Sequence, residues 1–202
     1  MDKYLNFSEL KKNETEGRDY CIHLRRGRSG VAIVAPHGGG IERGTRQIAD
    51  AIAGTEHSYY CFEGIKEKGN QVLHITSDHF DEPRCLAVVG HSEKVVTIHG
   101  AGAEEAAVYA GGLDDELKHN IILALSGAGF MAGSDPSPTR QGNGITNICN
   151  RGSSGTGVQL ELSGILRKKM FNPPDVDGYR HPNELFVSFV QTIRYVISAT
   201  QV

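Results

Sequence analysis

The stretch Val31-Ala-Ile-Val-Ala-Pro-His37-Gly-Gly-Gly-Ile-Glu42 has the features of a buried strand that ends in a sharp turn. Residues 31–35 form a short apolar run, which is typical of a strand inside a sheet. Three glycines follow His37, and their conformational freedom allows the chain to fold back on itself. We expect a helix to begin near Ile41 and to stop at Gly54.

The rest of the chain alternates between strand-like and helix-like segments. Expected strands cover residues 20–24, 31–35, 58–62, 72–76, 94–98, 108–110, 143–150 and 158–163. Expected helices lie within 1–18, 41–54, 81–90, 113–127 and 183–200, with long loops at about 128–145 and 150–157. This alternation predicts one catalytic domain over residues 1–202. Its expected fold is an α/β three-layer sandwich, with a central mixed, mostly parallel sheet and helices on both faces.

The composition is that of an ordinary globular protein. A chain of 202 residues with 39% hydrophobic and 22% charged residues can bury a core without covalent staples. The net charge of -3 argues against a general nucleic-acid binder, which would carry a basic surplus. None of the four cysteines forms a Cys-x-x-Cys pair, which argues against a thiolate zinc site, and we expect them to be reduced and mostly buried.

The ends and the apolar runs of the chain give no sign of a membrane. The N-terminal residues contain no apolar signal core, and no apolar run approaches the ~18 residues of a membrane span. We expect a protein that is made in the cytoplasm, has no membrane partner and works as a monomer.

Three side chains are candidates for a metal site. His37 leaves a buried strand, and Glu42 follows the glycines where the positive end of a helix would favour its ionised form. His99 ends the expected strand of Val95-Val-Thr-Ile-His-Gly100. Two histidines, a glutamate and an open water position are a standard catalytic zinc set.

Glu161 is the candidate general base. It lies in the strand-like run Gly157-Val-Gln-Leu-Glu-Leu-Ser163, and its parity places it on one face with Gln159 and Ser163. A carboxylate there could take a proton from a zinc-activated water and deliver it to a leaving amine.

Each of these residues also has an ordinary alternative role. His37 could be a turn residue, Glu42 a solvated acid, His99 a strand-end histidine and Glu161 an outward residue of an edge strand. The joint pattern favours a site, because ligands of open α/β folds bind at the carboxyl ends of strands. His74 and His91 are possible neighbours of the site, with a surface or structural role as the leading interpretation for both.

The His-Gly-Gly-Gly motif also occurs in the oxyanion loop of serine esterases. That mechanism requires a Gly-x-Ser-x-Gly elbow between a strand and a helix, and the sequence contains none. The glycines at 152–157 do not form a phosphate-binding loop either, because no Gly-Lys-Ser/Thr follows them.

Three blocks of the sequence resemble the poly-γ-glutamate hydrolases of Bacillus phages and their prophage-like bacterial relatives. They are His37-Gly-Gly-Gly-Ile-Glu-Arg-Gly-Thr45, Thr97-Ile-His-Gly100 and Val158-Gln-Leu-Glu-Leu-Ser-Gly-Ile-Leu-Arg167. The resemblance implies a fold like that of the zinc carboxypeptidases and cleavage of the γ-amide bonds of the poly-γ-glutamate capsule. It also implies a Zn²⁺ cofactor on His37, Glu42 and His99, with Glu161 as the general base.

Such a substrate carries a free α-carboxylate on every residue, and guanidinium groups bind carboxylates bidentately. The arginines nearest to the motifs are therefore candidate substrate contacts: Arg43, Arg140, Arg151 and Arg167. The expected enzyme would act outside the cell after release by lysis. Two other hypotheses stay open, a zinc peptidoglycan amidase and a non-catalytic module that binds an acidic polymer.

Overall fold

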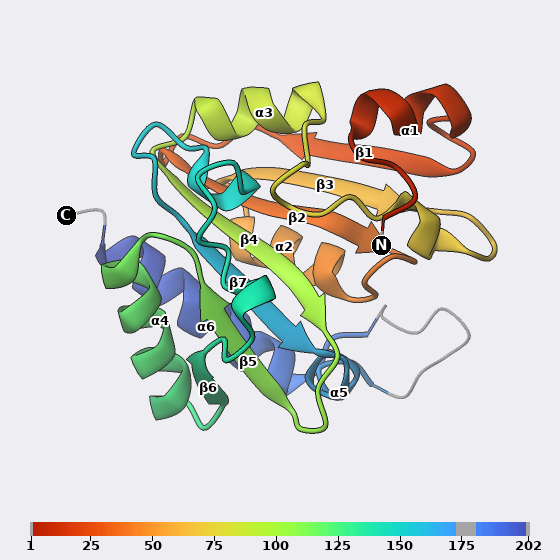
Figure 1. Ribbon diagram of the computed structural model, residues 1–202. Helices are drawn as coiled ribbons and strands as arrows, with labels where there is room; N and C mark the ends of the chain where they lie inside the picture. The colour runs from red at the N-terminus through yellow and green to blue at the C-terminus, as the bar shows by residue number, and fades with distance from the viewer. Residues whose placement is uncertain (1, 173–180, 201–202) are drawn as a thin grey trace.

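A mixed sheet of seven strands forms the centre of the computed structural model, which describes residues 2–172 and 181–200 (Figure 1). The strands are β1 (Tyr20–Arg25), β2 (Val31–Gly39), β3 (Ser58–Gly64), β4 (Lys94–Ala101), β5 (Ala107–Gly111), β6 (Met131–Ser134) and β7 (Val158–Ser163). Their order is β1-β3-β2-β4-β7-β5-β6. The β1–β3 and β5–β7 pairs are antiparallel and the other pairs are parallel, so the sheet is mixed and mostly parallel, as predicted.

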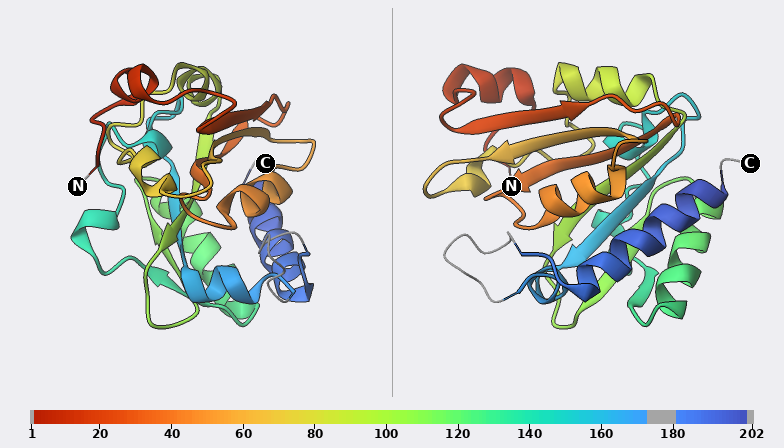
Figure 2. Two further views of the ribbon diagram at one scale, coloured as in Figure 1. Left: turned by 90° about the vertical axis from the view of Figure 1, so that its right-hand side faces the viewer. Right: turned by 180° about the vertical axis from the view of Figure 1, so that it is seen from behind.

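Helices cover both faces of this sheet. They are α1 (Phe7–Asn13), α2 (Thr45–Ala53), α3 (Pro83–Gly90), α4 (Asp115–Gly127), α5 (Gly164–Lys169) and α6 (Glu184–Ala199). In the views of Figures 1 and 2, α1 and α3 lie on one face, and α2, α4 and α6 lie on the other. Each helix layer has its own apolar core against the sheet. The predicted three-layer sandwich is confirmed.

Strand β2 shows why the sheet is buried on both faces. Val31, Ile33 and Ala35 pack against the layer of α2 and α6, while Ala32 and Val34 pack against the layer of α1 and α3. A parallel strand that helices cover on both faces is apolar at nearly every position. Residues 31–35 show this pattern.

Two expected strands are wrong. Residues 72–76 instead contain the end of a 3₁₀ turn, Asn70–Leu73, followed by a loop. Residues 143–150 form a loop that ends in the 3₁₀ turn Ile148–Asn150. In this loop the Asn150 side chain donates to the carbonyls of Gly142 and Gly144 at 2.7 and 2.9 Å. Asparagine side chains that satisfy nearby backbone groups compete with strand pairing.

The structure also differs from the prediction at one helix boundary and in two elements that were not expected. Helix α2 begins at Thr45 rather than near Ile41, because β2 continues to Gly39 and a turn follows it. The expected loop at 128–145 contains the short edge strand β6, which is largely exposed and lacks an apolar pattern. The short helix α5 directly after β7 was not predicted.

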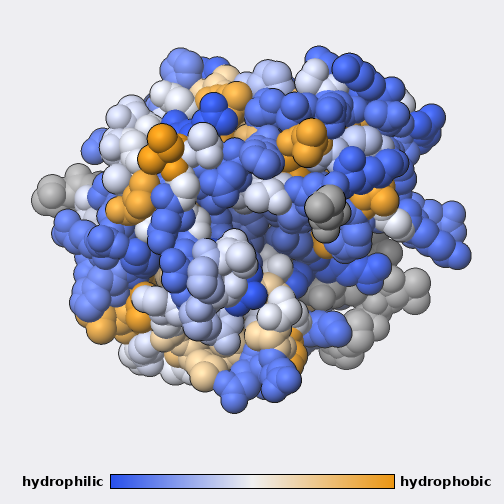
Figure 3. Space-filling model, viewed as in Figure 1, coloured by the Kyte–Doolittle hydropathy of each residue, from blue (hydrophilic) through white to orange (hydrophobic). Residues whose placement is uncertain are grey.

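The face of the molecule in Figure 3 is mostly hydrophilic, and its apolar residues form separate small groups. Among the described helices, none combines the length and the apolar character that a membrane crossing requires.

We expect Phe189→Ala to destabilise the protein by about 3–5 kcal/mol, because truncating a buried aromatic leaves a cavity. Phe189 lies on α6, is 0% exposed, and packs edge-on against Phe130 at 5.5 Å between ring centroids. Urea unfolding monitored by circular dichroism measures the effect. The matched control is Val187→Ala on the same helix, since Val187 is 46% exposed and its loss should change stability little. Equal effects of the two substitutions would contradict this account of the core.

Candidate functional site

Three candidate metal ligands converge near the carboxyl ends of β2 and β4. The Nδ1 atom of His37 lies 3.2 Å from Nδ1 of His99 and 3.2 Å from Oε1 of Glu42. The remaining pair, Nδ1 of His99 and Oε2 of Glu42, is 3.8 Å apart. The structure therefore brings together the three residues that the sequence singles out as metal ligands.

These distances suit a small tetrahedral ion. Zinc–nitrogen and zinc–oxygen bonds of about 2.0–2.1 Å place neighbouring ligand atoms about 3.3 Å apart in a tetrahedron. Nδ1 of His37 lies 3.2 Å from both Nδ1 of His99 and Oε1 of Glu42, which is close to that value, and Nδ1 of His99 lies 3.8 Å from the other Glu42 oxygen. The side chains therefore fit a zinc ion with one position left open, and they would need only small rotations to bind it.

A bulge in β2 directs His37 into the site. The register of β2 against β3 shifts between Ala35 and Gly38. Ala35 packs toward α2, whereas the His37 ring contacts Phe80 in the core on the opposite face of the sheet. β-bulges commonly re-aim a side chain in this way.

The glycines after His37 allow the turn that carries Glu42. Gly39 has a φ of +63°, and a Cβ atom there would lie 2.5 Å from both Cγ of Glu63 and the carbonyl oxygen of Gly64. Only glycine fits this position without strain. Glu42 lies in the turn before α2 rather than in its first turn, so the helix-dipole argument from the sequence does not apply in its predicted form.

Hydrogen bonds from the surrounding chain orient the three candidate ligands. Nε2 of His37 donates to the carbonyl of Ile75 at 2.8 Å, so Nδ1 is the ring nitrogen that faces the site. Nε2 of His99 lies 3.3 Å from the Ser77 hydroxyl, and the Gly100 N–H donates to Oε2 of Glu42 at 2.7 Å. Such outer partners fix the ring orientation and the tautomer of a metal-binding histidine.

The electrostatic environment keeps two of the three groups in their ligating form. Burial opposes ionisation of Glu42, but the neighbouring His37, helped by His99 and the Gly100 N–H, lowers the pKa of the carboxyl to about 2. Burial lowers the pKa of His99 to about 3, so its imidazole is neutral. The pKa of His37 is raised because Glu42 outweighs the effect of burial, and an incoming metal ion would displace that proton.

Glu161 stands on β7 directly beside His99 of β4. Burial, reinforced by the charge of Glu42, raises the pKa of Glu161 to about 8. Nε2 of Gln159 donates to Oε1 of Glu161 at 3.0 Å, and Nδ2 of Asn147 donates to Oε1 of Gln159 at 3.2 Å. Glu161 is therefore oriented by a hydrogen bond and has a pKa near neutral pH. A carboxyl group with these properties is suited to accept and release a proton.

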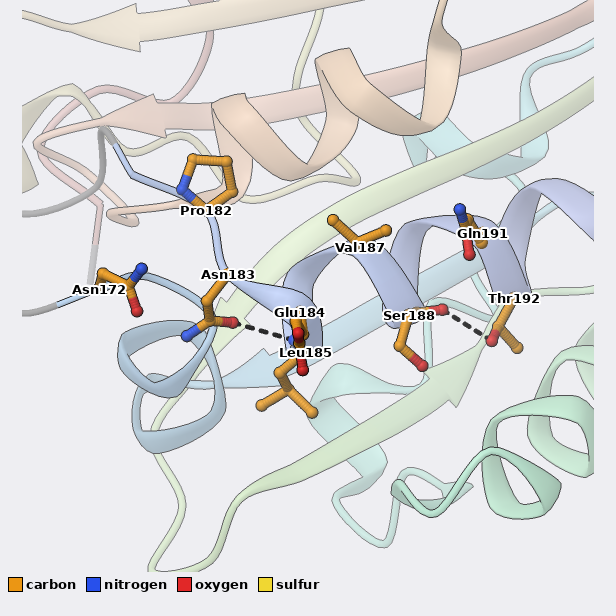
Figure 4. A pocket seen from close by; sticks show the side chains of 9 residues that line it. All are labelled: Asn172, Pro182, Asn183, Glu184, Leu185, Val187, Ser188, Gln191 and Thr192. Carbon is orange, nitrogen blue, oxygen red and sulfur yellow. Dashed lines mark hydrogen bonds between the residues drawn. The ribbon is translucent and has the colours of Figure 1, made fainter.

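These groups line a cleft of about 220 Å³. Its described lining also includes His74, Thr76, Ser77, Asp78, Gly100, Thr139, Arg140, Gly142, Asn147 and Gln159. A larger hollow of about 970 Å³ lies along α6 (Figure 4), and Glu184 is the single acidic or basic side chain among its described lining residues. The chemical groups therefore favour the smaller cleft as the functional site.

The four candidate arginines occupy different places. Arg140 lines the cleft, and its Nε and Nη2 atoms donate to the buried carboxylate of Asp135 at 3.0 and 3.1 Å. Arg151 lies in a neighbouring hollow of about 390 Å³ with Asp78. Arg167 is buried beside Gly100, and Arg43 is exposed. Among the described lining residues of the cleft, Arg140 alone comes from this set.

His74 lines the cleft, although the sequence analysis favoured a surface or structural role for this possible neighbour of the site. Its ring stacks on that of His37 with centroids 4.0 Å apart, and its Nδ1 lies 2.7 Å from the carboxylate of Asp2. The neighbouring Ser77 contacts His99. The loop that carries His74 and Ser77 crosses the strand ends. No local sequence motif predicts this position.

Comparisons with known proteins identify the family of this chain. A sequence profile of the poly-gamma-glutamate hydrolases matches residues 4–192. The UPF0714 protein YndL of Bacillus subtilis (strain 168) is 41% identical over 171 residues, which are 84% of this chain and 67% of YndL. A solved bacteriophage poly-gamma-glutamate hydrolase has a TM-score of 0.92 and 29% identity, and the match covers 99% of this chain and 98% of that one.

A structure of zinc-free, apo YndL has a TM-score of 0.93 and 36% identity, with all of both chains covered. The profile and the two structures extend over nearly the whole chain, so they concern the complete fold rather than a shared fragment. On this basis the chain belongs to the poly-gamma-glutamate hydrolase family.

Proposed function

We propose that this protein is a zinc-dependent hydrolase that cleaves the γ-glutamyl amide bonds of poly-γ-glutamate. His37, Glu42 and His99 hold the zinc ion, and Glu161 is the general base. The observation that carries the proposal is the convergence of three preorganised donor atoms beside a carboxyl whose pKa is near 8. The family assignment supports hydrolysis of this polymer, and the existence of a zinc-free form of YndL supports the choice of metal.

A bound zinc ion would supply a Lewis acid that polarises the amide carbonyl and lowers the pKa of a water molecule. Glu161 takes the proton of the attacking water and passes it to the amide nitrogen, which leaves as an amine. Gln159 holds Oε1 of Glu161 and keeps the second oxygen available for the proton. The positive charge of the metal also favours the ionised form of Glu161, which offsets the effect of burial.

Arg140 is the arginine that we propose for the substrate's α-carboxylate. It lines the cleft, and its bond to the buried Asp135 fixes the direction of the guanidinium group. Arg151, in the adjoining hollow, would contact a more distant residue of the polymer, since Asp78 lines both spaces. We assign Arg43 and Arg167 no direct contact, because neither lines the cleft.

A single chain supplies all the groups of this mechanism, so we propose that the protein acts as a monomer. Its substrate is a capsule polymer of the cell exterior, and we propose that the enzyme meets it there after release by lysis.

The His99→Ala variant should lose its zinc, because the remaining pair of ligands leaves the ion with incomplete coordination. Elemental analysis should find about one zinc per chain fewer in the variant than in the wild type. The matched control is His119→Ala, since His119 is exposed on α4. Chelation should abolish shortening of the polymer and added zinc should restore it. Full activity of the metal-free protein would refute the zinc mechanism, and polymer binding without metal or cleavage would favour the binding-module hypothesis.

The Glu161→Gln variant should retain zinc but lose activity by roughly 10²–10⁴-fold, because glutamine fills the same space and cannot carry the proton. Size-exclusion chromatography of digested poly-γ-glutamate measures the rate, and Glu116→Gln on the exposed face of α4 is the control. Near-normal cleavage by the variant would remove Glu161 from the proposed role. Digestion of peptidoglycan by the wild type, with no action on poly-γ-glutamate, would select the amidase hypothesis.

The Arg140→Lys variant should show a raised KM, by roughly tenfold, with a smaller change in kcat. Lysine preserves the charge beside Asp135 but cannot bind a carboxylate with the planar fork of arginine. Steady-state kinetics on γ-linked glutamate oligomers separates the two constants. Arg26→Lys at an exposed position provides the control. An unchanged KM would argue that another group binds the α-carboxylate.

A further inference from the structure

A second cluster of metal-ligand side chains lies on the edge of the sheet where β1 pairs with β3 (Figure 1). Cys21 of β1 pairs with Glu63 of β3, and His23 pairs with Cys61. Residues two apart in a strand share a face, so Cys21, His23 and Glu63 project to the same side. All three side chains are half-buried, and the cluster contains none of the proposed active-site ligands.

We propose that Cys21, His23 and Glu63 form a second metal site for a zinc-like, thiophilic divalent cation, separate from the active site. A thiolate, an imidazole and a carboxylate are all regular zinc ligands, and three of them leave a fourth position for water. This site goes beyond the hydrolase function and does not depend on it. The site has no Cys-x-x-Cys spacing, because pairing of two strands places its ligands together instead.

The atoms of the cluster are already close to binding positions. Sγ of Cys21 lies 3.2 Å from Nε2 of His23, and the same nitrogen lies 2.5 Å from Oε2 of Glu63. Zinc bonds of about 2.3 Å to sulfur and about 2.0 Å to nitrogen place those two ligand atoms about 3.5 Å apart. Binding therefore requires a small opening of the cluster through side-chain rotation, while the strands can keep their register.

A neighbouring positive charge balances the carboxylate of the cluster when no metal is bound. Nε of Arg46, on α2, lies 3.2 Å from Oε2 of Glu63 and compensates its charge.

The cluster also touches the turn that carries the proposed catalytic ligands. A Cβ atom on Gly39 would lie 2.5 Å from Cγ of Glu63, and one on Gly38 would lie 2.3 Å from Sγ of Cys61. The backbone after His37 therefore rests directly on the β3 side chains. A cation bound to Glu63 would brace this turn from the side opposite to the active site.

Cobalt(II) distinguishes the two sites, because the proposed active-site ligands include no sulfur. We expect chelator-treated wild-type protein to bind two equivalents and to show a near-ultraviolet thiolate-to-cobalt charge-transfer band. Cys21→Ser should lose the band and one equivalent. His99→Ala should lose one equivalent and keep the band, and Cys85→Ser, with its buried cysteine on α3, should keep both.

Thermal unfolding in chelator shows whether Cys21→Ser retains the wild-type fold. If it does not, His23→Gln replaces it as the test and should weaken binding of the second equivalent by at least roughly tenfold. Absence of the band in the wild type, or its persistence in a folded Cys21→Ser variant, overturns the proposal. A wild type that binds one equivalent, with the band, and no second equivalent would count against the active-site assignment and leave this one intact.

Discussion

The contact between the Glu42 carboxylate and the two histidines His37 and His99 is the interaction on which the rest of the site depends. The Nδ1 atoms of the two imidazoles lie 3.2 Å apart, and a negative charge beside them favours a proton or a cation at this point. Glu42 supplies that charge, and the Gly100 N–H holds it in place. The bulge in β2, the glycine turn and the position of β4 all serve to bring these three groups to one point.

The same arrangement sets the properties of Glu161. Its carboxyl is buried next to the negative charge of Glu42, and both effects raise its pKa. A dication held by the three ligands would oppose both effects, because a nearby positive charge favours the ionised form. Under the proposed function, metal binding and the protonation state of Glu161 would therefore be coupled. The hydrogen bond from Gln159 holds the Glu161 carboxyl in one orientation beside the candidate metal ligands.

Arginines near the motifs serve different purposes once the chain is folded. The Arg167 guanidinium donates to the carbonyls of Leu162 and Arg43, and it fills the space beside Gly100. It therefore links β7, the turn before α2 and the end of β4, which are the three segments that carry the candidate site. Arg140 is tied to Asp135 but still lines the cleft. Proximity in sequence to a motif placed both residues near the site. It did not show that Arg140 lines the cleft while Arg167 links the surrounding segments.

The sequence by itself determined the α/β sandwich, the strand ends that carry His37, His99 and Glu161, and the turn before Glu42. Apolar runs, helical periodicity and glycine clusters are local signals, and each reports the burial or the backbone freedom of its own segment. The tertiary structure alone decided that the loop with His74 and Ser77 crosses the strand ends, and that Asn147 supports Glu161 through Gln159. It also placed Cys21 opposite Glu63, with His23 two residues along β1 on the same face. These contacts join residues far apart in the chain, and strand order and register, which no local pattern encodes, bring them together.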